Sequence, residues 1–361
     1  MKEIKFEYDF DDILIVPSKK THISSRYKDI KLPKMLPLFT APMDTVVNFD
    51  NMDVFMDNGI NVTLPRTLKY DEFIDRFRKY NIFEYSKVFI SMGFDDIEKE
   101  YKTNFKGFYE NAHILIDVAN GHMQKVVDYA KEIKRLRPDI VLMVGNIANP
   151  ETYTWYAENK CVDYIRIGIG NGNGCLTTKQ SGIGYPMASL IHEIYQNKLL
   201  YVYDHKSDAD FTFPPAIVAD GGMKDFSDII KSLALGADYV MIGSIFNKAF
   251  ESSADMYLWG MKIANKRSAK YFFDRGLPVM KKFRGMSTKE AQKAMGKTVF
   301  KTSEGVTRVR KVEYYLEGWV ENFEHYLRNA MSYANAKTLE DFIGKVDICQ
   351  ISKNAYDRFN K

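Results

Sequence analysis

Tyr164-Ile-Arg-Ile167, followed at once by Gly168-Ile-Gly-Asn-Gly-Asn-Gly-Cys175, is the stretch that decides the fold. The largely apolar run predicts a buried β-strand. The glycines at alternate positions leave the backbone too free for a helix or a strand, so a loop follows whose amides can closely approach a ligand or an ion. That loop ends on Cys175, and a cysteine thiolate is a strong nucleophile at neutral pH. The sequence therefore predicts a nucleophile at the carboxyl end of a strand, where α/β enzymes carry their chemistry.

Short apolar runs of the same kind recur along the chain, each followed by a loop and an amphipathic segment. Several are almost continuous in Val, Ile and Leu, which is typical of parallel strands covered on both sides. Strand and helix alternating eight times favour a (β/α)₈ TIM barrel of the α/β class over an open sheet. The predicted strands are residues 36–41, 60–64, 88–92, 114–118, 140–144, 164–167, 216–219 and 239–242.

Helical patterns lie between these runs. Residues 121–137 have apolar side chains at helical spacing and stop at Pro138, residues 225–235 stop at Gly236, and residues 314–333 are again predicted to be helical. No linker divides the chain, so we expect a single catalytic domain over residues 1–361.

Two segments break the alternation. Residues 198–215 make an unusually long connection between the sixth helix and the seventh strand. Residues 268–313, approximately, have only patchy periodicity and follow the eighth strand. We expect this second segment to form a flap over the barrel.

The composition limits the possible classes of protein. The chain has 361 residues, 45% hydrophobic and 27% charged, with a net charge of +4. This balance does not indicate a nucleic-acid partner, but it is compatible with a phosphorylated small molecule. No apolar run is long enough to span a membrane, and the N-terminus is too charged for a signal peptide, so we expect a cytoplasmic protein. Cys161 and Cys349 are expected to be buried structural thiols.

Polar turns follow several predicted strands. Ala219-Asp-Gly-Gly-Met223 brings Asp220 either to vicinal hydroxyls of a ligand or to the start of the next helix as its cap. Together with that turn, Met241-Ile-Gly-Ser244 fits the phosphate site that such barrels form after their last two strands. The remaining turns either lie on the catalytic face or cap helices, and they are Pro42-Met-Asp-Thr45, Asp117-Val-Ala-Asn-Gly121 and Gly145-Asn146.

Two more motifs fall in the predicted flap, namely Phe283-Arg-Gly-Met-Ser287 and Ser303-Glu-Gly305. A glutamate in such a segment is more often a solvated surface residue than a general acid or base. The residues alone leave both roles open for Glu304.

In this order, the motifs resemble the IMP dehydrogenase/GMP reductase family over nearly the whole chain. The resemblance implies a (β/α)₈ barrel, usually a homotetramer, that acts on a purine nucleoside monophosphate with a nicotinamide cofactor. Its most specific parts are GIGNGNGCLTT (168–178), GIGYP (182–186), ADGG (219–222), ALGADYVMIGS (234–244) and RGMS (284–287).

Within this family the chain is more similar to GMP reductases. It has no room for the CBS modules that IMP dehydrogenases usually carry, and no Arg-Tyr pair occurs between residues 284 and 313. Ser303-Glu-Gly305, Asp117-Val-Ala-Asn-Gly121 and Tyr185 are similar to the reductase forms. The resemblance implies NADPH-dependent reductive deamination of GMP to IMP and ammonia through a thioimidate on Cys175. The alternatives are a CBS-less IMP dehydrogenase making XMP with NAD, a non-catalytic purine-nucleotide-binding barrel and a flavin-dependent barrel.

The chain also departs from the family pattern at several positions. Asn173 stands in place of a serine that contacts phosphate, and Phe283 in place of a tyrosine that does the same. Leu64-Pro-Arg-Thr67 replaces a His-Lys pair, and Met187 replaces a glutamine. These departures indicate that the preference for base or cofactor can differ from that of the bacterial and animal reductases.

The resemblance further implies roles for individual residues. Cys175 is the nucleophile, and Thr177 and Glu304 handle proton transfers. The substrate-binding residues are Asp220, Gly221, Gly222, Gly243, Ser244, Gly285, Met286, Ser287, Met43, Asn146 and Asn173. The cofactor-binding residues are Asp117, Ala119, Asn120, Gly121, Gly168 and Gly170, and the carbonyls of Gly170, Gly172 and Cys175 are expected to hold a monovalent cation such as K⁺.

Overall fold

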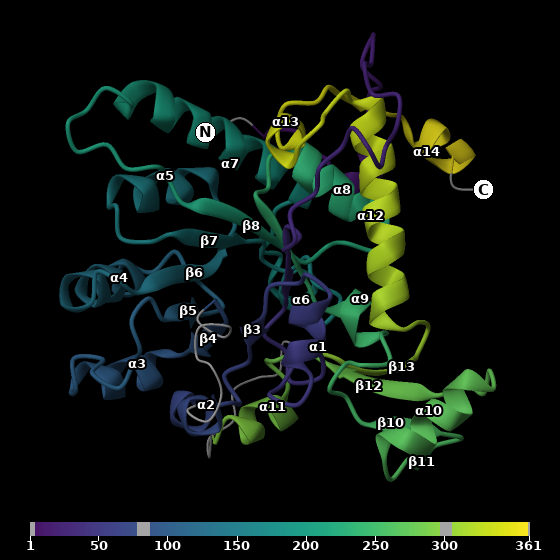
Figure 1. Cartoon of the computed structure of the whole chain (residues 1–361). Coiled ribbons are helices and arrows are strands. Elements are labelled where there is room, and N and C mark those ends of the chain that lie inside the picture. The colour runs from purple at the N-terminus through teal and green to yellow at the C-terminus, as the bar shows by residue number, and fades with distance from the viewer. Residues whose placement is uncertain (1–3, 78–86, 297–304, 360–361) are drawn as a thin grey trace.

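A sheet of eight parallel strands forms the centre of the computed structural model, which describes residues 4–77, 87–296 and 305–359 (Figure 1). The strands pair in the order β2-β9-β8-β7-β6-β5-β4-β3. A parallel bridge between Phe39 and Asn61 joins β2 to the segment before β3 and closes the circle. The predicted (β/α)₈ barrel is therefore confirmed. Its strands are β2 (Leu38–Thr40), β3 (Thr63–Leu64), β4 (Phe89–Met92), β5 (His113–Asp117), β6 (Val141–Ile147), β7 (Tyr164–Ile167), β8 (Ala216–Asp220) and β9 (Tyr239–Ile242).

Two apolar cores follow from the alternation of side chains along these strands. An aromatic cluster fills the barrel, where the ring of Phe89 packs edge-on against Phe39 at 5.7 Å and Tyr164 at 5.4 Å between centroids. The larger core lies between the strands and the helices outside them (Figure 1). These helices are α1 (Met52–Asp57), α2 (Tyr70–Phe77), α3 (Phe94–Tyr101), α4 (Gln124–Leu136), α5 (Pro150–Glu158), α7 (Met187–His205), α8 (Phe226–Leu235), α9 (Ser244–Asn247) and α12 (Leu316–Tyr333).

The ends of the predicted helices follow from local chemistry. Asp225 caps α8 by accepting a hydrogen bond from the Asp228 amide at 3.1 Å, and Gly236, with φ +115°, ends the helix in the left-handed conformation. The predicted helices at 121–137 and 314–333 are confirmed as α4 and α12, with slightly shorter bounds.

Two sequence predictions are wrong. The first half of the predicted connection at 198–215 is helical, because α7 continues to His205. Leu199 and Leu200 are exposed there, so this part of the helix lacks a one-sided apolar pattern. Cys161 is buried as predicted, but Cys349 is exposed, because it lies on β14 (Ile348–Gln350), which pairs with β1 (Ile13–Ile15) in a separate two-stranded sheet.

The segment predicted as an irregular flap contains regular structure. Four antiparallel strands in the order β11-β10-β12-β13 form what we call the flap sheet, which lies beside α9 in Figure 1. Its small core unites Phe250, Met256, Ala269, Val279 and Val312. The elements are β10 (Met256–Leu258), β11 (Met261–Lys262), α10 (Lys266–Asp274), β12 (Met280–Arg284), α11 (Lys289–Ala294) and β13 (Thr307–Lys311).

A buried lysine fixes the flap sheet to the chain that follows β9. The Lys281 side chain is fully buried, and its Nζ donates to the carbonyls of Ala249 and Phe250 at 2.8 Å each and to the Ser252 carbonyl at 2.9 Å. Burial lowers the pKa of this amine to about 7. These bonds hold the middle of β12 against the barrel.

The remaining short elements are a 3₁₀ turn (Phe10–Asp12), α6 (Thr177–Ser181), α13 (Leu339–Phe342) and α14 (Lys353–Phe359). Across the described ranges, no helix combines the length and apolar character needed to cross a bilayer.

Candidate active site

A cavity of about 260 Å³ opens at the carboxyl ends of the barrel strands, under the flap sheet. It brings together most of the residues that the sequence singled out. Asn120 and Gly121 do not line it, and Glu304 lies outside the described residues. The predicted residues that line it are Met43, Asp117, Ala119, Asn146, Gly168, Gly170, Gly172, Asn173, Cys175, Thr177, Asp220, Gly221, Gly222, Gly243, Ser244, Gly285, Met286 and Ser287.

Cys175 ends the glycine loop after β7 and is partly buried at the cavity wall. Its amide donates to the Gly172 carbonyl at 2.9 Å, and its Sγ lies 3.1 Å from Oγ1 of Thr177, the first residue of α6. The loop requires glycine at Gly170, because a Cβ there would lie 1.8 Å from Oγ1 of Thr178. The thiol therefore sits in a tight loop, in contact with one hydroxyl, and faces the cavity.

The flap sheet is closed directly onto this cysteine loop. The Val306 amide donates to the Gly174 carbonyl at 3.1 Å, and the Gly285 amide donates to the Val306 carbonyl at 3.0 Å. Cys175 and Gly305 form an antiparallel bridge. A Cβ on Gly285 would lie 2.5 Å from the Gly174 carbonyl oxygen, so glycine is needed for this approach.

Four charged side chains alternate in sign along the other side of the cavity. Asp117 accepts from Arg166 Nη1 at 2.7 Å and pairs with Arg66 Nε at 3.0 Å. Arg166 Nε also donates to Oδ2 of Asp220 at 3.0 Å. Burial raises the pKa of Asp117, but the two guanidinium groups outweigh it and hold the pKa below its usual value. The four charges therefore balance within the cavity wall.

Asp220 keeps part of its carboxylate free for a ligand. Its Oδ2 also accepts from Asn146 Nδ2 at 2.9 Å, while in the described chain no hydrogen bond reaches its Oδ1. The alternative role as a helix cap is wrong, since Asp225 caps α8. A carboxylate held from one side can accept hydroxyl hydrogen bonds on the other.

Arg66 and Arg166 are site residues that the sequence analysis missed. Arg166 lies inside the apolar run of β7, and alternation along the strand points it into the barrel with Tyr164. Arg166 could have been predicted as a site residue, because it is a charged residue at an inward position near the end of an otherwise buried strand.

The end of the cavity formed by Asn173, Gly243, Ser244, Gly285 and Ser287, here called the α9 end, is rich in neutral hydrogen-bond donors. Asn173 Nδ2 donates to Ser244 Oγ at 3.0 Å, which leaves the serine hydroxyl proton free to donate to a ligand. Ser244 is also the first residue of α9. Such donors suit an anion.

Two further observations concern the rest of the described chain. A larger cavity, about 560 Å³, lies outside the barrel between β1, α8 and α12, and none of the predicted site residues lines it. Within the described residues, no three His, Cys, Asp or Glu side chains gather as metal ligands.

Comparison with known proteins places this geometry in context. The model of the IMP dehydrogenase / GMP reductase domain matches residues 110–358. The chain is 25% identical to a GMP reductase of Caenorhabditis elegans over 366 residues, which covers 97% of this chain and 94% of that protein. It is 26% identical to a GMP reductase of Ascaris suum, covering 100% and 98% of the two chains, and 27% identical to one of Streptococcus agalactiae, covering 92% of each.

Proposed function

Because the chain belongs to the IMP dehydrogenase / GMP reductase family, we propose that it is a GMP reductase that converts GMP and NADPH to IMP, ammonia and NADP⁺. The position of Cys175 carries this proposal. Its thiol faces a cavity that also contains the Asp220 carboxylate and the hydrogen-bond donors of the α9 end. The similar chains named GMP reductase support the reductase over the dehydrogenase.

The first step is attack of the Cys175 sulfur on C2 of the guanine ring. The thiol loses its proton, the S–C2 bond forms and the ring nitrogen gains a proton. The C2–N bond then breaks, ammonia leaves with an added proton, and a thioimidate remains on Cys175. Thr177, whose hydroxyl oxygen lies 3.1 Å from the sulfur, is suited to relay these protons. Glu304, which lies outside the described residues, is proposed to assist; it precedes Gly305, the residue that pairs with Cys175.

The nucleotide is held at both ends of the cavity. Asp220 accepts from the ribose hydroxyls through its free Oδ1, while Asn146 and Arg166 keep the carboxylate in place. The phosphate lies at the α9 end, where Asn173 orients the Ser244 hydroxyl. The other residues proposed to line the substrate are Met43, Gly221, Gly222, Gly243, Gly285, Met286 and Ser287.

The nicotinamide cofactor is proposed to bind along the part of the cavity wall that contains Asp117, Gly168 and Gly170, where two arginines hold Asp117 in place. NADPH, when bound, would supply the hydride for C2. As the C2–H bond forms, the C2–S bond breaks, so Cys175 leaves as the thiolate and IMP is released. Ala119 lines the same wall. Asn120 and Gly121 do not line the cavity, and we propose that they support this wall from behind. The Gly121 amide donates to the Asn146 carbonyl at 2.8 Å.

A monovalent cation such as K⁺ is proposed to bind the carbonyls of Gly170, Gly172 and Cys175. The Gly172 carbonyl already accepts from the Cys175 amide, so the cation would use its second lone pair. Exchange of K⁺ for Na⁺ at constant ionic strength should then lower turnover. We further propose that the active form is a cytoplasmic homotetramer, which sedimentation of the purified protein tests.

Two parallel assays test the reaction itself. The purified protein is incubated with GMP plus NADPH, and separately with IMP plus NAD. We expect NADPH oxidation with release of ammonia in the first and no XMP in the second. XMP formation without NADPH oxidation would instead identify an IMP dehydrogenase, and a yellow protein would indicate flavin chemistry.

A further inference from the structure

Two arginines of β13 have no ion-pair partner in the described chain and lie on the same face of the flap sheet as Phe283, which lines the cavity. Arg308 lies opposite Phe283 in the register of the flap sheet, and Arg310 lies opposite Lys281. Directly paired residues of antiparallel strands share a face, so both arginines lie on the side of the sheet occupied by Phe283. The Arg310 guanidinium stacks on the Phe283 ring, 4.4 Å from its centroid, and Phe283 lines the cavity.

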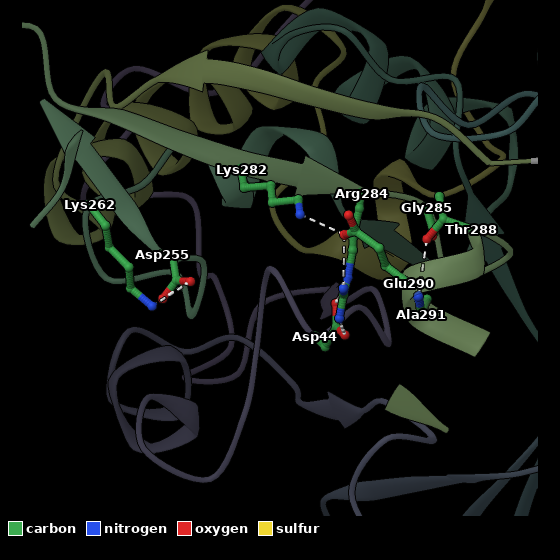
Figure 2. A network of polar contacts seen from close by, with 9 residues as sticks. All are labelled: Asp44, Asp255, Lys262, Lys282, Arg284, Gly285, Thr288, Glu290 and Ala291. Atoms are coloured by element: carbon green, nitrogen blue, oxygen red, sulfur yellow. Dashed lines mark hydrogen bonds and ion pairs between the residues drawn. The ribbon is translucent and has the colours of Figure 1, made fainter. Parts of the chain in front are cut away.

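On the opposite face of the flap sheet, the cationic side chains of β12 are paired with carboxylates. Lys282 and Arg284 point the other way from β12, and Figure 2 shows both reaching Glu290, while Arg284 also pairs with Asp44. No such carboxylate meets Arg308 or Arg310 among the described residues. Two positive side chains are therefore left together on one face.

The surroundings of Arg310 disfavour its charged form. Burial lowers its pKa, and the charge of Arg308 lowers it further. Glu313 opposes this effect, but its carboxylate is bonded to Lys248 Nζ at 3.0 Å. A bound anion would stabilise the charged form of Arg310, because it would supply an opposite charge.

Among the described residues, the α9 end also has no cation of its own. Of the residues that line the cavity, the charged ones are Arg66, Asp117, Arg166 and Asp220, and these pair with one another. A phosphate ester carries a charge of about −1.5 to −2 at neutral pH. It would meet only neutral donors at this end, with Phe283 offering none.

We propose that Arg308 and Arg310 form a phosphate-recognition site on the flap, behind Phe283 and next to the α9 end. The ligand is a phosphate ester, either the 5′-phosphate of the substrate nucleotide or the 2′-phosphate that distinguishes NADPH from NADH. Which molecule carries the phosphate rests on the proposed function. The preference for phosphate rests on two guanidinium groups that have no ion-pair partner among the described residues.

The test compares Arg308→Gln and Arg310→Gln with Lys311→Gln in the full chain. Lys311 is the matched control, since it is exposed on the same strand but on the other face. The first measurement is the rise in melting temperature caused by inorganic phosphate. We expect a smaller rise in both arginine variants and an unchanged rise in the control. Phosphate titration does not depend on the reaction, so it remains informative if the proposed function fails.

The second measurement identifies the source of the phosphate. If it is the substrate, each arginine variant should bind GMP about 10-fold or more weakly and guanosine as before. If it is the cofactor, the KM should rise for NADPH and not for NADH. The proposal is overturned if both variants respond to inorganic phosphate like the wild type, or if guanosine and GMP weaken equally. Arg310→Lys, which keeps the charge, and the exposed Arg308 variant cover the case in which Arg310→Gln fails to fold.

Discussion

Arg166→Met should destabilise the protein strongly, because Arg166 is the cation that both cavity carboxylates share. Its guanidinium lies 2.7 Å from Asp117 and 3.0 Å from Asp220, and all three side chains are less than one-fifth exposed. Removing one partner from a buried ion pair costs about 3–5 kcal/mol, since the remaining charge stays desolvated. Urea unfolding at pH 8 measures the loss. Arg135→Met is the control, because its pair with Glu132 is exposed to solvent and should contribute little to stability.

The pH dependence of the same variant separates charge from packing. In the wild type the pKa of Asp117 is lowered, so stability is lost as the pH falls through that low value. Without Arg166, the pKa of Asp117 should rise, because Arg66 alone is left to oppose the effect of burial, and the variant should regain stability as the pH falls from 8 toward 5. A loss below about 1 kcal/mol at pH 8, or a pH slope equal to that of the wild type, would refute the reasoning.

Three further predictions concern the flap and α8. Lys281→Met should lower the free energy of unfolding by about 2–4 kcal/mol, because it leaves several buried hydrogen-bond acceptors unpaired. Urea unfolding measures this loss, and a loss near zero would show that Lys281 does not hold β12 in place. Burial raises the pKa of Asp228 from 3.8 to about 6, so its protonation favours the folded state and stability should fall as the pH rises from about 4 to 6. Asp228→Asn should flatten that part of the stability profile, and an unchanged profile would count against it. Gly285→Ala should lower kcat/KM by about 10-fold or more, because the added Cβ meets the Gly174 carbonyl oxygen at 2.5 Å and pushes the flap off the cysteine loop. Gly318→Ala, which meets nothing within 4 Å, is its control, and equal kinetics for the two variants would exclude this contact as important.

The barrel could be predicted from the sequence because several strands are almost continuous apolar runs buried on both sides. Residues such as Ile114 and Leu115 are both fully buried, one against the helices and the other inside the barrel. The glycine loop and the glycine of the flap motif could also be predicted, since Gly170 and Gly285 allow close approaches that a Cβ would prevent. Local patterns of this kind reflect the buried environment of each residue directly.

The other features depend on tertiary contacts that local patterns do not show. The flap sheet was missed because β12 (Met-Lys-Lys-Phe-Arg) has charged side chains on both of its faces, so its sequence lacks the apolar alternation of a strand. The partners of these charges, such as Asp44 and Ala249, lie elsewhere in the chain. Arg166 was missed because its neighbours in sequence are apolar, while its partners come from β5 and β8. The exposed end of α7 carries apolar residues toward solvent, so it gave no amphipathic signal.

The central claim is that the Cys175 sulfur forms a covalent bond to the purine ring. GMP-dependent NADPH oxidation by Cys175→Ala, measured alongside GMP affinity, tests it most directly. We expect no detectable oxidation and an affinity for GMP close to that of the wild type, because the loop, Asp220 and the α9 end remain in place. Substantial oxidation by this variant would contradict the covalent route.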